Sequence, residues 1–343
     1  MPMIPVTLQN QKRMKSVTAL AGAAMETERP SPRYADIDRW DPADVLEAML
    51  GGQFAAVAAV RAALPEIQRA GLGLEQRLKS GGRLIYAGAG TSGRLAVQDG
   101  AELMPTFSWP PERLLLLIAG GEEAMVRAVE GAEDEAGRAA ELAGHHQINS
   151  EDALIAVAAS GTTPFTLSCL REARRRGAFA VGIANNPGTP MLEEAEQAIF
   201  LNTGPEPIAG STRMNAGTAQ RIALNLLSTL VMIRLGRVYR GMMVDVQSTN
   251  IKLTKRKAAM VAFLTGGTEQ DAQRALERAR GNVKLAVLLS HGCDCQSAEN
   301  ALRRAEGKLR GAIDLIYGAD HPTRTQAESG HGKEGTCPGL KNE

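Results

Sequence analysis

The sequence predicts an α/β fold in which helices flank a parallel sheet, followed by a small helical domain. From residue 83 onward, short apolar runs alternate with longer stretches of helical periodicity. This alternation is the pattern of βαβ units whose sheet is buried on both faces. After Lys257 the strand signals stop, and short helical segments separated by glycines follow. The five expected strands are residues 83–87, 114–119, 153–158, 179–183 and 198–201.

Helical periodicity begins before the first strand. Asp41 is suited to cap a helix and Pro42 to occupy its first turn, and a second helix is expected over residues 65–79. A long apolar stretch from about Thr218 to Leu235 predicts a helix that is buried in the fold or against another subunit. The helices expected between the strands cover residues 93–104, 122–142 and 164–176.

The composition changes along the chain predict its domain organisation. Both ends lack a sustained apolar pattern and are rich in residues that cannot bury enough apolar area to offset chain entropy. We therefore expect residues 1–24 and 319–343 to be dispensable. The expected parts are a mobile N-terminal arm at 1–30, an α/β domain with N-terminal helices at 31–257, a helical domain at 258–318 and a disordered tail at 319–343.

Charge and composition exclude several classes of function. The 39 Lys and Arg residues nearly balance 38 Asp and Glu residues, and aromatic residues make up only 3% of the chain, so nucleic acid is not an expected partner. No run reaches the roughly 18 consecutive apolar residues of a membrane helix.

Residues 12–24 superficially resemble a signal peptide, but they are rich in Ala and Gly, and Met25 is an alternative start to Met1. With only four cysteines, we expect a cytoplasmic protein.

The first strand runs into a glycine-rich loop, Gly88-Ala-Gly-Thr-Ser-Gly93, that precedes a helix. Such a loop lets the backbone approach a phosphate at a helix N-terminus. A dinucleotide site would also need an acidic residue about 20 positions further on, and Glu122 is poorly placed for this role. The hydroxyls of Thr91 and Ser92 instead suit a terminal phosphate.

The third strand ends in a second hydroxyl-rich loop that contains Ser160 and Thr163. Because the carboxyl ends of parallel strands meet at one edge of a sheet, the two loops are expected to converge on one ligand. Either loop alone is better explained by Ser/Thr capping of a helix. The two together favour a monophosphate site.

Two acidic stretches follow these strands. Glu102 ends the first of them, and Glu130, Glu133 and Asp134 form the second. A single Glu on a helix is usually only solvated, but on the helix expected at 122–142 Glu130 would share a face with Glu133 or Asp134. A carboxylate pair near the ligand is one interpretation. His291-Gly-Cys-Asp-Cys295 lacks a second Cys/His pair at zinc spacing, so no metal site is expected.

The sequence resembles the N-acetylmuramic acid 6-phosphate etherases, a family built on the sugar isomerase domain, over about residues 25–315. The N-terminal segments Thr27-Glu-Arg-Pro30 and Ala35-Asp-Ile-Asp38 also fall where this family has comparable segments. The resemblance is carried, in order, by Gly82-Arg-Leu-Ile-Tyr-Ala-Gly-Ala-Gly-Thr-Ser-Gly-Arg-Leu95, Ile118-Ala-Gly-Gly-Glu122, Val129-Glu-Gly-Ala-Glu-Asp134, Ala158-Ala-Ser-Gly161, Gly204-Pro-Glu206, Gly210-Ser-Thr-Arg-Met214, Ala216-Gly-Thr-Ala-Gln220, Val244-Asp-Val246 and Thr249-Asn250.

This resemblance implies a three-layer αβα sugar isomerase domain and a specific activity. Glu102 matches the catalytic acid of the family and Glu133 its catalytic base. The implied substrate is the amino sugar phosphate MurNAc 6-phosphate, which is cleaved to GlcNAc 6-phosphate and D-lactate during cell-wall sugar recycling. The resemblance also implies a cytoplasmic homodimer without a metal or organic cofactor. The positions that match the phosphate-binding residues are Thr91, Ser92, Ser160 and Thr163.

Some positions depart from the family pattern, and two other functions stay open at this level. The family usually has Cys and Pro where this chain has Leu103 and Met104, Lys where it has Asn215, and Glu where it has Ile251. These differences bear on how strictly the lactyl ether is required. The alternatives are a non-catalytic phosphosugar-binding regulatory protein and an aldose–ketose sugar phosphate isomerase.

Overall fold

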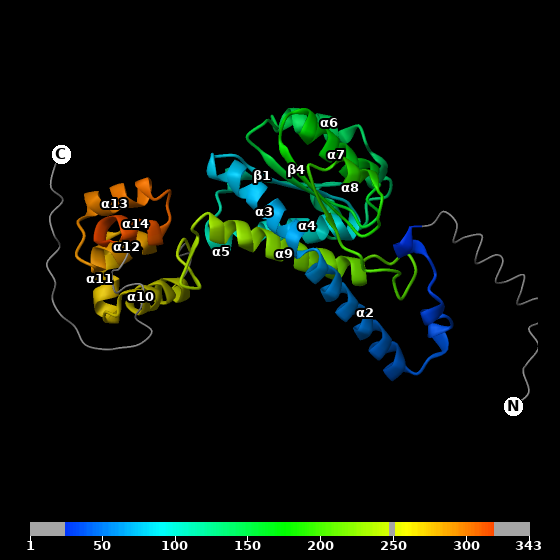
Figure 1. Ribbon diagram of the computed structural model, residues 1–343, viewed down its shortest axis with the longest axis horizontal. Coiled ribbons are helices and arrows are strands. Elements are labelled where there is room, and N and C mark those ends of the chain that lie inside the picture. Colours follow the sequence, from blue (N-terminus) through cyan, green and yellow to red (C-terminus); the bar gives the residue numbers. More distant parts are fainter. Residues whose placement is uncertain (1–24, 247–250, 319–343) are drawn as a thin grey trace, which may run out of the picture. The chain divides into compact units, whose positions relative to one another are not determined.

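The computed structural model describes residues 25–246 and 251–318, and it divides into two compact units. The first unit contains the described residues up to Gly100 together with Glu112–Ser228. The second contains Ala101–Pro111 and the described residues from Thr229 onward. Most of the expected N-terminal arm and all of the expected tail lie outside the described residues. Figure 1 labels the α-helices of both units and two strands of the first, β1 and β4.

The first unit is built on a five-stranded parallel sheet with strand order β2-β1-β3-β4-β5. Its strands coincide with the five apolar runs expected from the sequence, which confirms the predicted fold class. β1, β3 and β4 are buried along their whole lengths, as is typical of a sheet covered on both faces. The strands are β1 (Leu84–Gly88), β2 (Leu114–Ile118), β3 (Ala153–Val157), β4 (Phe179–Ala184) and β5 (Gln197–Phe200).

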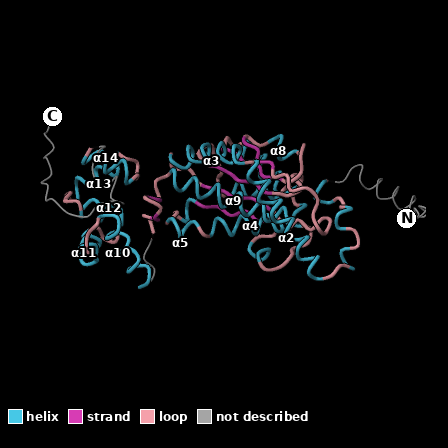
Figure 2. Tube along the Cα trace, turned by 60° about the horizontal axis from the view of Figure 1, so that its bottom comes forward, coloured by secondary structure: helices cyan, strands magenta, loops and turns pink. Residues whose placement is uncertain are grey.

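Helices cover both faces of this sheet because alternate side chains point to opposite sides of each strand (Figures 1 and 2). Ile85 and Leu154 belong to a core cluster shared with α6 and α7. Phe179 points to the other face, where a Cβ added at Gly73 of α3 would lie 2.2 Å from its ring. The helices of this unit include α3 (Leu64–Lys79), α4 (Gly90–Ala101), α6 (Arg138–His145), α7 (Pro164–Arg175) and α8 (Pro190–Glu194), and its short 3-10 turns include η1 (Glu26–Glu28), η2 (Pro32–Tyr34) and η3 (Ile37–Arg39).

The single helix expected at 122–142 is wrong. Two short 3-10 turns, η5 (Glu122–Met125) and η6 (Ala132–Asp134), precede α6 in this region. Gly131, directly before η6, has a φ of +74°, which a right-handed helix does not allow. As a result, Glu130 and Glu133 do not share a helical face.

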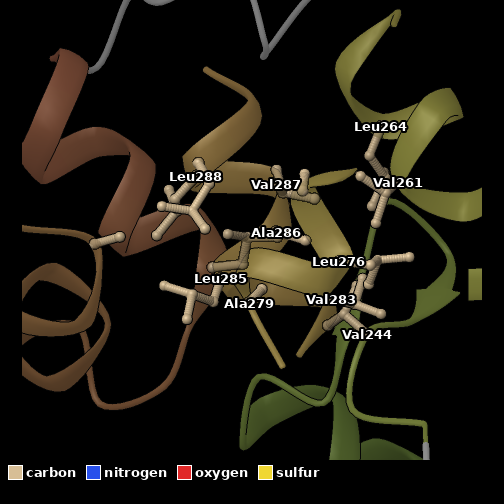
Figure 3. Packing of buried hydrophobic residues seen from close by; sticks show 14 of the residues in the cluster. Val244, Val261, Leu264, Leu276, Ala279, Val283, Leu285, Ala286, Val287 and Leu288 are labelled. Atoms are coloured by element: carbon tan, nitrogen blue, oxygen red, sulfur yellow. The ribbon is translucent and has the colours of Figure 1, made fainter. Parts of the chain in front are cut away.

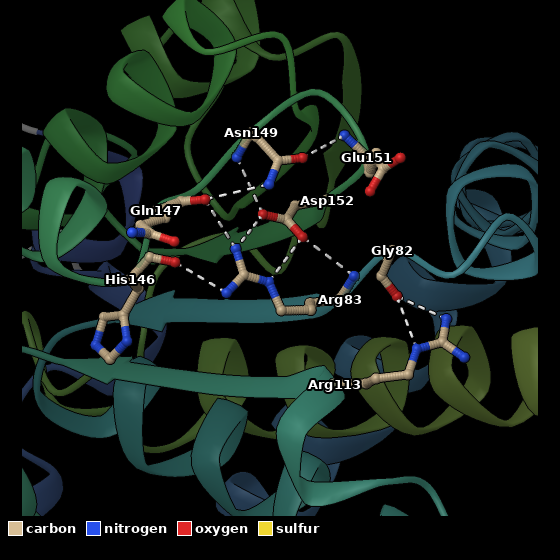
Figure 4. A network of polar contacts seen from close by, with 8 residues as sticks. All are labelled: Gly82, Arg83, Arg113, His146, Gln147, Asn149, Glu151 and Asp152. Carbon is tan, nitrogen blue, oxygen red and sulfur yellow. Dashed lines mark hydrogen bonds and ion pairs between the residues drawn. The ribbon is translucent and has the colours of Figure 1, made fainter.

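A polar network holds the amino ends of β1, β2 and β3 in place (Figure 4). It lies at the opposite edge of the sheet from the loops that follow β1 and β3. The guanidinium of Arg83 donates to both carboxylate oxygens of Asp152, at 2.9 and 2.6 Å, and to the carbonyl oxygen of His146 at 2.8 Å. The Asp152 side chain is only 2% exposed and also accepts from the amide of Asn149. Arg113, just before β2, donates to the carbonyl oxygen of Gly82.

Two described helices, α2 (Pro42–Ala62) and α9 (Asn215–Arg234), are long and apolar enough to span a membrane by length and composition alone. Core helices of soluble proteins share this length and composition. α2 leaves one apolar stripe exposed along its length. Leu46, Leu50, Phe54 and Val57 are 64%, 49%, 68% and 50% exposed.

The second unit is helical, in agreement with the expected C-terminal helices. Its core is formed by side chains such as Val261, Leu276, Val287 and Leu288 (Figure 3). The helices α11 and α13 repeat one local pattern. A side chain caps the N-terminus of each helix, and two consecutive residues with positive φ follow its C-terminal end. The elements include α5 (Leu103–Phe107), η4 (Pro111–Arg113, which straddles the boundary of the units), the hairpin of β6 (Val238–Tyr239) and β7 (Met242–Met243), and the helices α10 (Ile251–Thr265), α11 (Glu269–Arg278), α12 (Val283–Ser290), α13 (Cys295–Arg304) and α14 (Leu309–Tyr317).

Candidate active site

The loop after β1 turns sharply into α4 because of its glycines. Gly90 has a φ of +53°, in the left-handed region that favours glycine. Gly88 and Gly93 pack so closely that a Cβ added at Gly93 would lie 2.8 Å from the carbonyl carbon and oxygen of Gly88. The absence of both side chains lets the first turn of α4, with Thr91 and Ser92, approach the end of the strand.

The loop after β3 presents a second set of hydroxyls at the start of α7. Gly161 has a φ of +69° and makes the turn, and the hydroxyls of Ser160 and Thr163 lie 3.0 Å apart. Ser160 also accepts from the amide of Thr162 at 3.2 Å. Thr163 occupies the N-cap position of α7, yet its side chain makes no capping hydrogen bond. Helix capping therefore does not account for the Thr163 hydroxyl.

Both loops line one pocket of about 440 Å³ at the carboxyl edge of the sheet. The structure brings together five of the six site residues expected from the sequence: Thr91, Ser92, Ser160, Thr163 and Glu133. The complete lining is Glu28, Ala89, Gly90, Thr91, Ser92, Glu133, Asp134, Ala158, Ala159, Ser160, Thr162, Thr163, Pro164, Gly210 and Thr212.

The hydroxyl-rich side of this pocket is suited to a phosphate monoester. The N-terminus of α4 directs free backbone N–H groups and the positive end of a helix dipole toward it. None of the lining residues is a Lys or Arg. Binding of an anion here would therefore depend on backbone N–H groups and on the hydroxyls of Thr91, Ser92, Ser160 and Thr163.

Three carboxylates line the same pocket: Glu28, Glu133 and Asp134. Glu133 and Asp134 lie in η6, whereas Glu28 comes from the N-terminal turn η1. Within the described part of the chain, no group of three or more His, Cys, Asp and Glu side chains is arranged to hold a metal ion. An ionised carboxylate can accept a proton, and it can accept hydrogen bonds from a polar ligand.

Glu102 does not line this pocket. It follows Ala101, the last residue of α4, whereas Thr91 and Ser92 lie in the first turn of that helix. The 12 residues of α4, at a rise of 1.5 Å each, give a length of roughly 18 Å. The acid implied by the resemblance therefore follows the opposite end of the helix from the hydroxyls.

Sequence reasoning missed several lining residues, above all Glu28. The pattern-based prediction assigned residues 1–30 to an arm, but Thr27 in this stretch is only 1% exposed. The available signals were the segments Thr27-Glu-Arg-Pro30 and Gly210-Ser-Thr-Arg-Met214, which match the family without a role attached to them. The other lining residues that were missed are Thr162, Gly210 and Thr212, whereas Asp134 was considered only as one possible member of a carboxylate pair.

Comparison with known proteins places this fold and pocket in a family. A protein of Deinococcus radiodurans described as N-acetylmuramic acid 6-phosphate etherase is 50% identical over 268 residues, which is 77% of this chain and 86% of the relative. The chain belongs to the N-acetylmuramic acid 6-phosphate etherase family. A relative of the same description from Streptomyces avermitilis is 43% identical over 77% of this chain and 85% of its own length.

The chain was also compared with models of protein domains and with solved structures. Residues 67–174 match the family model of the glucokinase regulatory protein N-terminal SIS domain, and residues 135–230 match that of the SIS domain. Among solved structures, a phosphoheptose isomerase from Francisella tularensis has 20% sequence identity and a TM-score of 0.42, covering 57% of this chain and 98% of its own.

Asn215, one of the departures from the etherase pattern, lies outside the pocket lining at the start of α9. It is 2% exposed, and its Oδ1 accepts from Nε2 of Gln53 at 3.2 Å. The backbone amides of Asn215 and Ala216 donate to the two carboxylate oxygens of Glu206, at 2.8 and 2.9 Å. Burial raises the pKa of Glu206, and these two hydrogen bonds oppose the shift. The Asn215 side chain thus bonds to α2 in the described structure.

A second pocket of about 470 Å³ lies beside the edge strand β2. Its walls include the apolar side chains of Val97, Leu116 and Phe165. None of the site residues expected from the sequence lines it. The chemistry expected of an etherase is therefore better served by the hydroxyl-lined pocket.

Proposed function

We propose that this protein is an N-acetylmuramic acid 6-phosphate etherase, a carbon–oxygen lyase of amino sugar catabolism. It cleaves the lactyl ether of MurNAc 6-phosphate to give GlcNAc 6-phosphate and D-lactate with uptake of one water. The observation that carries the proposal is 50% identity to a relative of that description over most of both chains. The pocket supports it, because it combines hydroxyls for a phosphate with carboxylates for proton transfer.

The phosphate would anchor the substrate at one side of the pocket. Thr91 and Ser92 at the N-terminus of α4, with Ser160 and Thr163 before α7, supply hydroxyls to its oxygens. Fixing the phosphate restrains an otherwise polar and flexible sugar, and this positioning lowers the entropic part of the barrier. We assign these four residues to phosphate binding.

Glu133 is assigned the role of general base. In the ring-opened sugar, the C1 aldehyde acidifies the C2 proton, and an ionised carboxylate removes it to form an enolate. The electrons of the enolate then expel the lactyl oxygen from C3, and this step needs an acid to protonate the leaving group. Water adds to C3 of the resulting unsaturated aldehyde, and a proton returns to C2.

Glu102 is assigned the role of that acid, and its position connects the assignment to a homodimer. Because Glu102 follows the end of α4 opposite the pocket hydroxyls, we propose that it serves the pocket of a second copy of the chain. The exposed apolar stripe of α2 supports association, since four large apolar side chains there lie about half or more exposed. An assembly of two copies would then contain two equivalent sites.

We place this reaction in the cytoplasm. The described cysteines Cys169, Cys293 and Cys295 are all free thiols, as a reducing compartment favours. The amino sugar phosphate is the expected small-molecule partner.

The direct test is incubation of the purified protein with MurNAc 6-phosphate and measurement of D-lactate. The expected result is stoichiometric release of lactate and GlcNAc 6-phosphate. A phosphosugar-binding regulatory protein would bind the compound without releasing lactate. An isomerase would exchange the C2 proton and interconvert aldose and ketose, again without lactate, and either result would refute the proposal.

Two variants separate the assigned roles. Glu133→Gln is expected to abolish both lactate release and exchange of the C2 proton with deuterated water. Glu102→Gln is expected to stop lactate release but to leave C2 exchange measurable, because the enolate still forms. Each loss should be about 10²-fold or more, the scale of one general acid or base. C2 exchange that survives in Glu133→Gln would show that the base is another residue.

A further inference from the structure

The N-terminal segment around Thr27 is fixed to the loops that surround the pocket. The Thr27 amide donates to Oδ1 of Asn186 at 3.3 Å, and Nδ2 of Asn186 donates back to the Thr27 hydroxyl at 2.9 Å. The same Nδ2 donates to the carbonyl oxygen of Ala159 at 2.8 Å. The amide of Gly210 donates to the carbonyl oxygen of Thr27 at 2.9 Å. Thr27 is thereby connected to the segments that follow β3, β4 and β5.

This anchoring holds the next residue, Glu28, at the pocket. Its neighbour across the pocket rim is Gly210, where an added Cβ would lie 3.9 Å from Oε2 of Glu28. Thr27 is buried, whereas Glu28 is exposed. The buried Thr27 therefore fixes the backbone from which a solvent-facing carboxylate lines the pocket.

A carboxylate at this place is unsuited to contact a phosphate dianion, because like charges repel. It can accept hydrogen bonds from neutral donors such as sugar hydroxyls. In the proposed substrate, the phosphate is on C6 and the reacting carbons are C2 and C3. The carbons between them, C4 and C5, each carry a hydroxyl in the ring-opened form.

We infer that Glu28 is a substrate-binding residue that accepts a hydrogen bond from the C4 or C5 hydroxyl of the ring-opened sugar. This inference rests on the proposed function, because the substrate defines which donors lie between the phosphate and the base. The N-terminal segment then acts as part of the active site, and Glu28 recognises the sugar chain independently of the lactyl group. GlcNAc 6-phosphate, which keeps the same hydroxyls, should depend on Glu28 as the substrate does.

The test compares Glu28→Ala with Glu26→Ala, the same change in the same turn at a residue outside the pocket lining. Loss of a hydrogen bond to a charged acceptor predicts a fall in kcat/KM of about 10–100-fold for Glu28→Ala, mainly through KM. The inhibition constant of GlcNAc 6-phosphate should rise by a similar factor. That of inorganic phosphate, which lacks hydroxyls on a carbon chain, should stay the same or fall. Glu26→Ala should match the wild type in all three measurements.

A third variant, Thr27→Val, tests the anchor itself. It removes the hydroxyl that Asn186 contacts, so it should reproduce part of the rise in KM while Glu28 is still present. Unchanged KM and product inhibition in Glu28→Ala would overturn the inference. So would a parallel weakening of phosphate and product binding together with a lower melting temperature, because that pattern indicates only a structural role.

The experiment also separates this inference from the proposed function. If the wild-type protein releases no lactate, the proposed activity fails whatever Glu28 does. Binding of GlcNAc 6-phosphate measured by calorimetry then still tests the contact. Equal binding constants for the wild type and Glu28→Ala would refute it, and weaker binding by the variant would support it.

Discussion

Adding a single methyl group at Gly93 should disrupt the phosphate side of the pocket without removing any polar side chain. In Gly93→Ala the new Cβ would lie 2.8 Å from the carbonyl carbon and oxygen of Gly88, whereas ordinary contacts begin at 3.4 Å. The two nearest obstructing atoms are backbone, so β1 and α4 must separate by about 0.6 Å, the difference between these distances. A hydrogen bond of about 2.9 Å from the first turn of α4 would then lengthen to about 3.5 Å, beyond the favourable range.

We therefore expect Gly93→Ala to lower kcat/KM for MurNAc 6-phosphate by about 10–100-fold, since a displacement of about 1 Å can cost 10²-fold. Inhibition by inorganic phosphate should weaken in parallel, because the shift affects the anchoring groups directly. Steady-state kinetics with a lactate assay measure both effects. Gly137→Ala is the control, as its Cβ meets no atom within 4 Å. Wild-type kinetics in a folded Gly93→Ala protein would refute the argument that this close approach positions the site.

Two further predictions concern assembly and stability. Mixing Glu102→Gln with Glu133→Gln and allowing subunit exchange should restore about a quarter of wild-type lactate release, because half of the dimers are then mixed and each contains one intact pair. No recovery after verified exchange would contradict the proposal that Glu102 serves the partner's pocket. Asp152→Ala should lower the free energy of unfolding by about 3–5 kcal/mol, because it leaves the Arg83 guanidinium without its buried partner. Urea titrations check this value against the exposed-pair variant Glu141→Ala, expected below about 1 kcal/mol, and a similar small loss in both would contradict it.

The strands were predictable from the sequence because a strand buried on both faces has an unmistakable local pattern. Runs such as Ala153–Val157 are uninterrupted apolar stretches of the correct length, bounded by polar or glycine-containing turns. The loops after β1 and β3 were equally readable, because glycines and hydroxyls that directly follow such a strand are typical of a turn that binds an anion. The region 122–142 was not, since its helical composition conceals the effect of Gly131, whose positive φ interrupts the helix.

The sequence by itself therefore determined the α/β class, the family and the two hydroxyl-rich loops, all of which depend on residues close together in the chain. The tertiary structure alone decided which distant segments meet at the pocket. Glu28 lies far from Ser160 and Gly210 in the chain, and hydrogen bonds through Asn186 and Thr27 bring it to the same rim. Glu102 is close in sequence to Thr91 and Ser92, yet the straight path of α4 separates it from them. Local patterns encode an element and its direction, whereas long-range contacts determine which side chains share a site.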